Sequence, residues 1–251
     1  NIVVGRSRKV TGPYVDNMGR GMLQGGGKMV IAAGDRKTGP GHFGRFIVED
    51  GVEKMSYHYE ADFDRGGRSV LAIRPLLWKN GWPVAGEVFK EGTYEIESER
   101  RGYALELSVD FVRMESVRHR FWEKDDKPIT PLKLQTLDDV IGTWSQGNIN
   151  VMIRDYMFRP HQKWTITSVP DAGGYLGAHY YKIVIEGTNR ALTATPDAEV
   201  VTVPEFTGAP GQLWRIEQLT DGTYRRMPRE IPGTDKELVL VSTCHTTPSL
   251  G

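Results

Sequence analysis

The chain of 251 residues contains a single cysteine, Cys244, and this excludes an internal disulfide framework. Lysine and arginine together number 32, as do aspartate and glutamate, so neither sign of charge is in excess. Composition therefore favours neither nucleic acid nor an anionic membrane as a partner. No apolar run comes near the roughly 20 residues of a membrane-spanning helix. No signal peptide precedes Asn1, and the strand-like start NIVVGRS leads us to expect that further sequence once preceded it.

The chain is rich in the alternation and turn chemistry of β structure. Hydrophobic residues make up 39% and charged residues 25% of the sequence, which is ordinary for a globular protein of one or two domains. Short β-rich runs such as KMVIAA, GRFIVED and EKMSYHYE are separated by glycine clusters, and this pattern predicts an all-β fold. The pairs Asp50-Gly51 and Asn80-Gly81 suit tight hairpins, because these residue types tolerate positive φ.

The pattern changes between residues 115 and 140. The segment EKDDKPITP combines charge with two prolines and lacks apolar alternation, which is typical of a linker or a strap around a domain. One short helix is expected next to it, on an apolar face formed by Leu134, Leu137, Val140 and Ile141.

An internal repeat follows the linker. HQKWTI and GQLWRI share a Gln-x-Trp-x-Ile frame, and their tryptophans, Trp164 and Trp214, are 214 − 164 = 50 residues apart. Only short β runs lie between them, so the sequence favours a repeat architecture over a single sandwich.

The Gln-x-Trp frame resembles the ricin-type β-trefoil, in which each of three repeats ends in this motif. The resemblance implies a ricin-like β-trefoil over residues 141–251, with two repeat ends present. In sugar-binding repeats of that family an aspartate, an aromatic platform and an asparagine stand where this chain has Thr193, Pro204 and Gly211. Sugar contacts would then come from other residues, for example Tyr175 or Tyr180. The repeat residues themselves are expected in the core: Gln162, Trp164, Gln212 and Trp214.

The stretch from Thr38 to Val84 holds the candidate site residues. In TGPGHFG, glycines hold the backbone tightly and leave His42 and Phe43 as the large side chains of the turn, a composition that permits close approach to a ligand or serves only as a turn. His58 alternates with two tyrosines on a predicted strand and suits a buried, satisfied histidine better than a ligand. Arg68 lies in a GR turn and could donate a bidentate pair of hydrogen bonds or be a solvated loop residue. Arg74 lies an even six residues further, so it could share a face with Arg68, and a structural ion pair is its expected role.

Six motifs stand in the order seen in arabinan-cleaving enzymes of glycoside hydrolase family 43: SRKVTGPYVD, a GGG turn, GPGHFG, YHY, IRPLLW and NGWPV. The region from Asn1 to Val84 resembles that family. The resemblance implies that residues 1–114 are the last blades of a five-bladed β-propeller. It implies that His42 lies at the propeller axis and helps to hold calcium, and that Arg68, His42 and Phe43 belong to the sugar pocket. Calcium prefers oxygen ligands, so chemistry alone would not propose this metal site.

The catalytic carboxylates are expected outside this sequence. Inverting glycoside hydrolysis needs a general acid and a general base about 6.5–9.5 Å apart. In the family that this chain resembles, they precede the strand matching NIVVGRS, and none of Asp35, Glu60, Asp62 and Asp64 matches them. No residue of this chain is therefore predicted to be catalytic, and a missing N-terminal segment or a partner chain would supply the acid and base.

The resemblance implies part of a secreted or periplasmic inverting hydrolase of α-L-arabinofuranosyl linkages in plant arabinan or arabinoxylan. One alternative keeps the family but changes the substrate to β-xylosides or galactan. A second alternative is a non-catalytic carbohydrate-binding or assembly subunit. Partial propeller blades would expose unpaired strand edges, so such a subunit should be insoluble or oligomeric without a partner.

Overall fold

A computed structural model describes residues 1–34, 37–49, 51–61, 66–98, 100–109, 147–175, 178–242 and 248–250. These residues form β-strands and short 3-10 turns, which confirms the prediction of an all-β fold. None of the described segments is a helix long and apolar enough to cross a membrane. The linker and helix predicted between residues 115 and 141 lie outside the described residues, as does Cys244.

The chain divides into two compact units, each built from three segments. The first unit comprises Asn1–Lys90, Ser168–Tyr181 and Trp214–Met227, and the second comprises Glu91–Thr167, Lys182–Leu213 and Pro228–Gly251.

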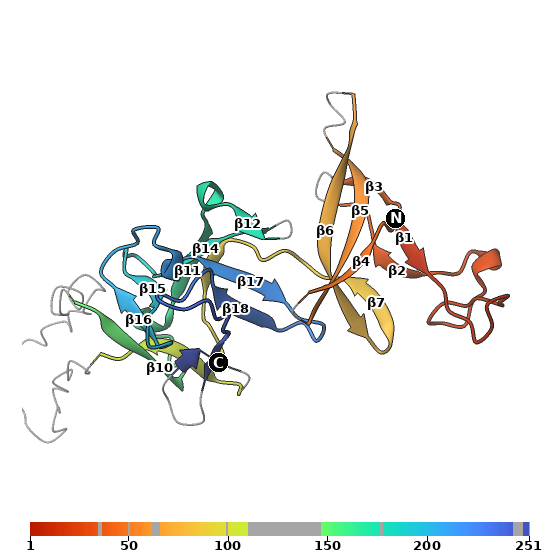
Figure 1. Cartoon of the computed structure of the whole chain (residues 1–251). Helices are drawn as coiled ribbons and strands as arrows, with labels where there is room; N and C mark the ends of the chain where they lie inside the picture. The colour runs from red at the N-terminus through yellow and green to blue at the C-terminus, as the bar shows by residue number, and fades with distance from the viewer. Residues whose placement is uncertain are drawn as a thin grey trace, which may run out of the picture. The chain divides into compact units, whose positions relative to one another are not determined.

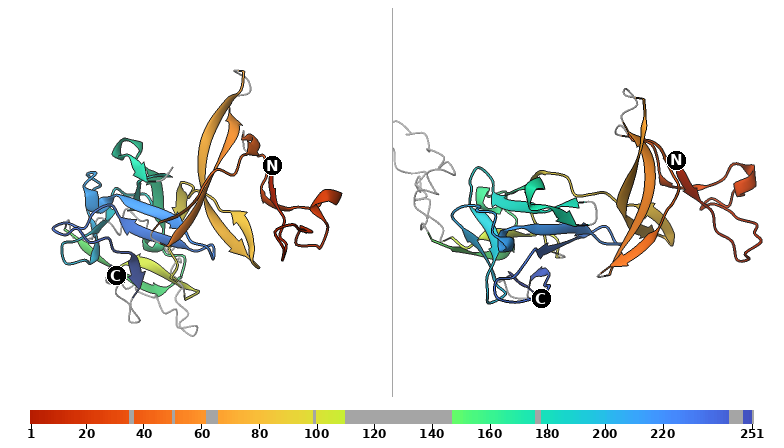
Figure 2. Two further views of the ribbon diagram at one scale, coloured as in Figure 1. Left: turned by 45° about the vertical axis from the view of Figure 1, so that its right-hand side comes forward. Right: turned by 45° about the horizontal axis from the view of Figure 1, so that its top comes forward.

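The first unit is built on a five-stranded antiparallel sheet and contains three further pairs of strands (Figure 1). The sheet has the order β3-β5-β6-β7, with β4 also paired to β5. Its long central strands lie antiparallel and curl along their length in every view (Figure 2). The pairs are β1–β2, β12–β13 and β17–β18. The strands are β1 (Ile2–Val4), β2 (Lys28–Ile31), β3 (Thr38–Gly41), β4 (Phe46–Glu49), β5 (Val52–Ala61), β6 (Arg68–Lys79), β7 (Trp82–Ala85), β12 (Gly174–Tyr175), β13 (Ala178–His179), β17 (Trp214–Gln218) and β18 (Tyr224–Pro228), with a 3-10 turn η1 (Met22–Gln24).

Two predicted hairpins join strands of this sheet. Asn80 and Gly81 both have positive φ, 53° and 72°, and connect β6 to β7 through the facing pair Lys79 and Trp82. Glu49 faces Val52 across the second turn, as a two-residue loop requires. Both hairpins therefore confirm what the sequence predicts at Asn80-Gly81 and beside Gly51.

The strict alternation of β5 decides which side chains reach the core. Met55 and Tyr57 are fully buried and pack with Val30 and Leu76. His58 points to the opposite face, since successive side chains of a strand alternate. The alternation that the sequence shows in KMSYHYE is thus the pattern of a sheet with one apolar face.

The second unit is an antiparallel β structure with its own core. Its strands run in the order β14-β15-β16-β10-β9, with β11 paired to β8 and β14. The core contains Trp164, Leu105, Ile183, Ile185 and Leu192, each at most 1% exposed. The strands are β8 (Gly92–Tyr94), β9 (Tyr103–Leu107), β10 (Ile149–Asp155), β11 (Trp164–Ser168), β14 (Tyr181–Ile185), β15 (Ala191–Ala194), β16 (Val200–Val203), β19 (Leu240–Ser242) and β20 (Pro248–Leu250), and the 3-10 turns are η3 (Pro160–Gln162) and η5 (Pro210–Gln212). A further 3-10 turn, η4 (Pro170–Ala172), belongs to the first unit.

The two Gln-x-Trp motifs form matching corners. Gln162 accepts a hydrogen bond from the amide five residues before it (2.8 Å) and donates one to the carbonyl seven residues before it (2.8 Å). Gln212 makes the same two bonds at the same offsets, 2.8 and 3.2 Å long. Trp164 and Trp214 are both 0% exposed. The prediction that these four residues belong to the core is confirmed, and each glutamine closes the loop ahead of a buried strand.

Candidate functional site

His42 lies in the glycine turn that the sequence singles out, and the turn is fastened to β5. The amide of Gly44 donates to the carbonyl of Ser56 (2.8 Å), and the amide of Arg45 donates to Oγ of Ser56 (2.9 Å). His42 itself has a left-handed φ of 45°, a conformation more common for histidine than for most side chains. Its exposed ring lies 5.0 Å from the ring of His58, measured between centroids. The turn thus brings two imidazoles together on one face of the sheet.

The glycines of this turn are required by the closeness of β5. A Cβ on Gly44 would lie 2.8 Å from Oγ of Ser56, and one on Gly41 would lie 3.3 Å from Nε2 of His58. Any larger residue would push the turn away from the strand and separate the two histidines.

Arg68 lies on the opposite face of the sheet from the histidine pair. It begins β6 and faces Ala61, whereas His58 faces Leu71. Arg68 is exposed, and it shares its face with Arg74, as their even spacing predicts. Arg74 makes the expected structural contacts, a hydrogen bond from Nε to the carbonyl of Gly86 (2.5 Å) and an ion pair with Glu87 (4.0 Å). The structure therefore brings His42, which precedes Phe43 in the turn, together with His58, and it places Arg68 on the other face of the sheet.

The described residues around His42 do not by themselves make a calcium site. Calcium takes six to eight oxygen ligands, and the histidine pair offers nitrogen. Glu60, on the same face as His58, accepts a hydrogen bond from Ser69. Across the described part of the chain, no group of three or more His, Cys, Asp or Glu side chains is placed to hold a metal. Calcium at His42 stays a prediction that these residues alone do not support.

Phe43 lines a wide apolar hollow of the first unit. The hollow has a volume of about 500 Å³ and is bordered by Phe43, Phe46 and Trp78 together with Leu76 and residues of β1. These three aromatic rings are 45–48% exposed, which is high for large apolar side chains. An exposed apolar surface of this kind marks an interaction site more often than a free surface.

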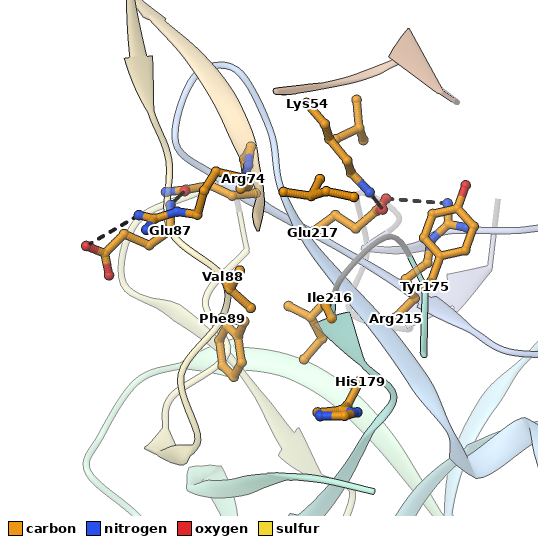
Figure 3. A pocket seen from close by; sticks show the side chains of 15 residues that line it. Lys54, Arg74, Glu87, Val88, Phe89, Tyr175, His179, Arg215, Ile216 and Glu217 are labelled. Carbon is orange, nitrogen blue, oxygen red and sulfur yellow. Dashed lines mark hydrogen bonds and ion pairs between the residues drawn. The ribbon is translucent and has the colours of Figure 1, made fainter. Parts of the chain in front are cut away.

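A second, smaller pocket in the first unit contains buried charges (Figure 3). Its floor is formed by Lys54 of β5 and by Arg215 and Glu217 of β17. Lys54 Nζ donates to Oε1 of Glu217 (2.8 Å), and both side chains are 7% exposed. The hairpin β17–β18 that carries Glu217 is held against the sheet by main-chain bonds, such as the one from the Trp78 amide to the Thr220 carbonyl (3.3 Å).

Three cations surround the single carboxylate of this floor. Arg225 donates to Oε2 of Glu217 at 2.8 Å, and Arg215 lies 3.4 Å from the same oxygen. Burial alone would raise the pKa of Glu217, but the hydrogen bonds from Lys54 and Arg225, with the charges of Lys54 and Arg215, lower that pKa below its ordinary value. Glu217 is therefore ionised at neutral pH.

An aromatic ring covers this floor. Cζ of Arg215 lies 3.9 Å and Nζ of Lys54 lies 4.8 Å from the centre of the Tyr175 ring, so one ring contacts two cations. Tyr175 comes from the hairpin β12–β13 (Figure 3). Sequence reasoning named Tyr175 as a possible sugar contact but missed Lys54, Arg215 and Glu217. Lys54 and Glu217 are 163 residues apart, and no motif connects them.

A further cluster of buried charge lies in the second unit. Glu106, 2% exposed, lies between Arg154 (3.2 Å), Arg159 (3.7 Å) and His161 (3.7 Å), and it accepts a hydrogen bond from Gln162 (2.9 Å). Burial raises the pKa of Glu106 despite the charges of the two arginines. Burial, with the charges of Arg159 and Arg154, lowers the pKa of His161 from 6.5 to about 4. This cluster holds the Gln162 corner through the hydrogen bond from Gln162 to Glu106, so we interpret it as structural.

The cluster leads to a prediction on pH. His161 binds its proton more weakly when folded than when unfolded, so its contribution to stability is complete above pH 6.5 and is lost as the pH falls toward 4. The loss amounts to about 2–3 kcal/mol. In His161→Gln the part of the pH dependence of the free energy of unfolding that comes from His161 should disappear. The opposite dependence that Glu106 causes should remain in both proteins. Urea unfolding at pH 7, 5.5 and 4 measures the difference, and parallel pH curves for the two proteins would contradict it.

Part of the chain is similar in sequence to proteins that are named as arabinanases and arabinofuranosidases. No family model matches the chain. It is 39% identical over 82 residues to the extracellular endo-α-(1→5)-L-arabinanase 1 of Bacillus subtilis, a match covering 33% of this chain and 24% of that protein. It is 42% identical over 89 residues to the extracellular exo-α-(1→5)-L-arabinofuranosidase ArbA of Cellvibrio japonicus, a match covering 35% of this chain and 25% of that protein. About a third of the chain is thus homologous to arabinanases and arabinofuranosidases.

A solved α-L-arabinanase from Cellvibrio cellulosa is 40% identical to the chain over 33% of this chain and 26% of that one, with a TM-score of 0.30. The chain spans about a quarter of the length of the curated relatives that it matches.

Proposed function

We propose that this chain is part of an inverting glycoside hydrolase that cleaves α-L-arabinofuranosyl linkages in plant arabinan or arabinoxylan. The observation that carries the proposal is the identity of about 40% with named arabinanases over a third of the chain. The first unit would belong to a five-bladed propeller, and residues 141–251 would form a ricin-like β-trefoil. The matching Gln162 and Gln212 corners support the trefoil part of the proposal.

In this proposal the acid and base come from outside the sequence, in a preceding segment or a partner chain. Support comes from the relatives, which are about four times as long as the matched stretch. The apolar hollow beside Phe43, Phe46 and Trp78 would be the surface against which the rest of the propeller packs, because that packing would remove three exposed aromatic rings from water. His42 would lie near the axis, below the sugar. An extracellular location is also proposed, since the two relatives are named as extracellular.

The test is a hybrid enzyme. The 89 matched residues of the Cellvibrio japonicus relative are exchanged for the corresponding stretch of this chain. We expect the hybrid to cleave linear arabinan and to leave xylan and galactan intact, because the exchanged stretch would supply an equivalent floor and wall to the relative's own acid and base. Reducing-sugar release from the three polysaccharides measures this.

Two outcomes would count against the proposal. Cleavage of xylan or galactan in place of arabinan would favour the alternative with another substrate. A folded but inactive hybrid would favour the alternative of a non-catalytic carbohydrate-binding or assembly subunit. His42→Ala in the hybrid is the control for the site itself, and it should lower arabinan turnover while leaving the melting temperature nearly unchanged, because the His42 ring is exposed.

A further inference from the structure

A third pocket of the first unit lies beside β2, on the apolar face of the sheet. It has a volume of about 240 Å³, well above the roughly 30 Å³ that one water occupies in the liquid. Residues of β2, β3 and β7 give it apolar walls, and its polar lining consists of Lys37, Tyr57, Arg74 and Glu87. Tyr57 points to the opposite face of β5 from His58, so this pocket is separate from the histidine pair.

Tyr57 supplies a hydroxyl group that needs a hydrogen-bond partner. The residue is 1% exposed, and among the described residues its hydroxyl oxygen has no such partner. A buried polar group without a partner is costly, and native proteins seldom leave one in that state. Since Tyr57 lines the pocket, a group bound there would supply the missing acceptor.

Lys37 adds a cation that has no ion pair in the described part of the chain. Its Nζ lies 5.7 Å from the centre of the Tyr59 ring, and that centre is 6.3 Å from the centre of the Tyr57 ring. The face of a ring attracts a cation without accepting a conventional hydrogen bond. The three N–H donors of the Lys37 ammonium group are therefore available to an anion.

Arg74 adds a second cation from the neighbouring strand. The register of β5 with β6 makes Arg74 a diagonal neighbour of Tyr57 on the same face of the sheet. Its Nε donates to the carbonyl of Gly86, whereas its terminal nitrogen lies 4.0 Å from Glu87, which is beyond hydrogen-bond distance. Glu87 is 60% exposed and also pairs with Lys90 (3.2 Å), so it offsets the charge of Arg74 only in part.

We propose that this pocket binds an oxyanion, that is, a phosphate ion or the carboxylate of a small organic acid. The oxygens of the ligand would accept hydrogen bonds from the Lys37 ammonium group, the terminal N–H groups of Arg74 and the Tyr57 hydroxyl. Hydrogen bonds between ionised groups are the strong ones, and a neutral sugar would leave both cations uncompensated. The inference rests on the lining of the pocket and not on the proposed function.

Titration followed by NMR tests the proposal on the full chain. The probes are sodium phosphate and D-galacturonate, with D-galactose as the neutral counterpart and sodium chloride at matched ionic strength. We expect at least one of the two oxyanions to shift the resonances of Lys37 and Tyr57 in a saturable way, and galactose and chloride to leave them unchanged. A response to phosphate alone identifies a site for the free ion, and a response to galacturonate alone identifies a site for an organic carboxylate. Equal shifts with galactose or chloride, or no saturable shift with either oxyanion, would overturn the proposal.

Matched variants separate binding from folding. Lys37→Gln should bind the oxyanion at least about tenfold more weakly, the effect of losing one charged hydrogen bond. Tyr57→Phe keeps the packing of the ring and should weaken binding by about three- to tenfold, the effect of losing one neutral hydrogen bond. It should unfold at no lower urea concentration than the parent, because it removes a hydroxyl without a partner among the described residues. Lys79→Gln changes an exposed lysine of β6 that does not line the pocket, and it should bind as the parent does.

Unchanged oxyanion binding in folded Lys37→Gln and Tyr57→Phe would overturn the assignment to this pocket. A marked loss of stability in Tyr57→Phe would show that the hydroxyl is satisfied within the protein, and it would overturn the assignment of that group to a ligand. Both results are independent of arabinan cleavage, so this proposal and the proposed function fail separately.

Discussion

Glu217→Gln is expected to lower the free energy of unfolding by about 3–5 kcal/mol, the cost of breaking a buried ion pair by removing one partner. The substitution leaves Lys54, Arg215 and Arg225 buried around a neutral amide. It should also reduce the loss of folding stability at acid pH. The pKa of Glu217 is lowered from 4.5 in the folded chain, so its stabilisation is complete above that pH and is lost as the pH falls further. Urea unfolding followed by circular dichroism measures both effects.

Glu87→Gln is the matched control for Glu217. Glu87 lies 4.0 Å from Arg74 and its side chain is 60% exposed, so its removal should cost no more than about 1 kcal/mol. The pair Lys54→Met and Glu217→Gln, combined in one chain, closes a double-mutant cycle and isolates the coupling between the two residues. If Glu217→Gln costs no more than Glu87→Gln, the charged floor does not hold the first unit together.

Trp164→Ala should destabilise the second unit by about 3–5 kcal/mol, since a fully buried aromatic side chain is removed and a cavity remains. The indole also donates from Nε1 to the carbonyl of Leu105 (2.8 Å), which joins the Gln-x-Trp corner to β9. Trp164→Phe keeps most of the packing but loses this bond, and it should cost less than the alanine change. Tryptophan fluorescence during urea unfolding measures the series.

Trp78→Ala provides the comparison for Trp164. Trp78 is 45% exposed and borders the apolar hollow, so its loss should cost well under half as much in the isolated chain. Equal costs at Trp78 and Trp164 would contradict the assignment of Trp164 to the core.

Local patterns made much of the fold predictable. The alternation in β5 places Met55 and Tyr57 in the core and His58 on the other face, because a strand has a period of two. Asn80 and Gly81 adopt the positive φ values that their residue types favour. The Gln-x-Trp spacing identifies buried residues because each glutamine bonds to main-chain groups within seven residues of itself.

The charged pocket could not be predicted, for a physical reason. Lys54 lies on a strand whose pattern is fully explained by the sheet, and its partner Glu217 belongs to a hairpin 163 residues away. Only the folded chain decides that these groups meet, and neither residue has a motif around it. For the same reason, the sequence does not decide on which face of the sheet Arg68 lies. Its even spacing from Arg74 predicts a shared face, but the face that carries the histidine pair depends on the register of β5 with β6.

Release of reducing sugar from linear arabinan tests the central proposal most directly. It compares this chain alone, the hybrid with the Cellvibrio japonicus relative, and the relative itself under identical conditions. We predict no release by the chain alone, because its acid and base would come from elsewhere, and release by the hybrid within about tenfold of the relative. Arabinan cleavage by the chain alone, or a folded hybrid with no activity, would contradict the account.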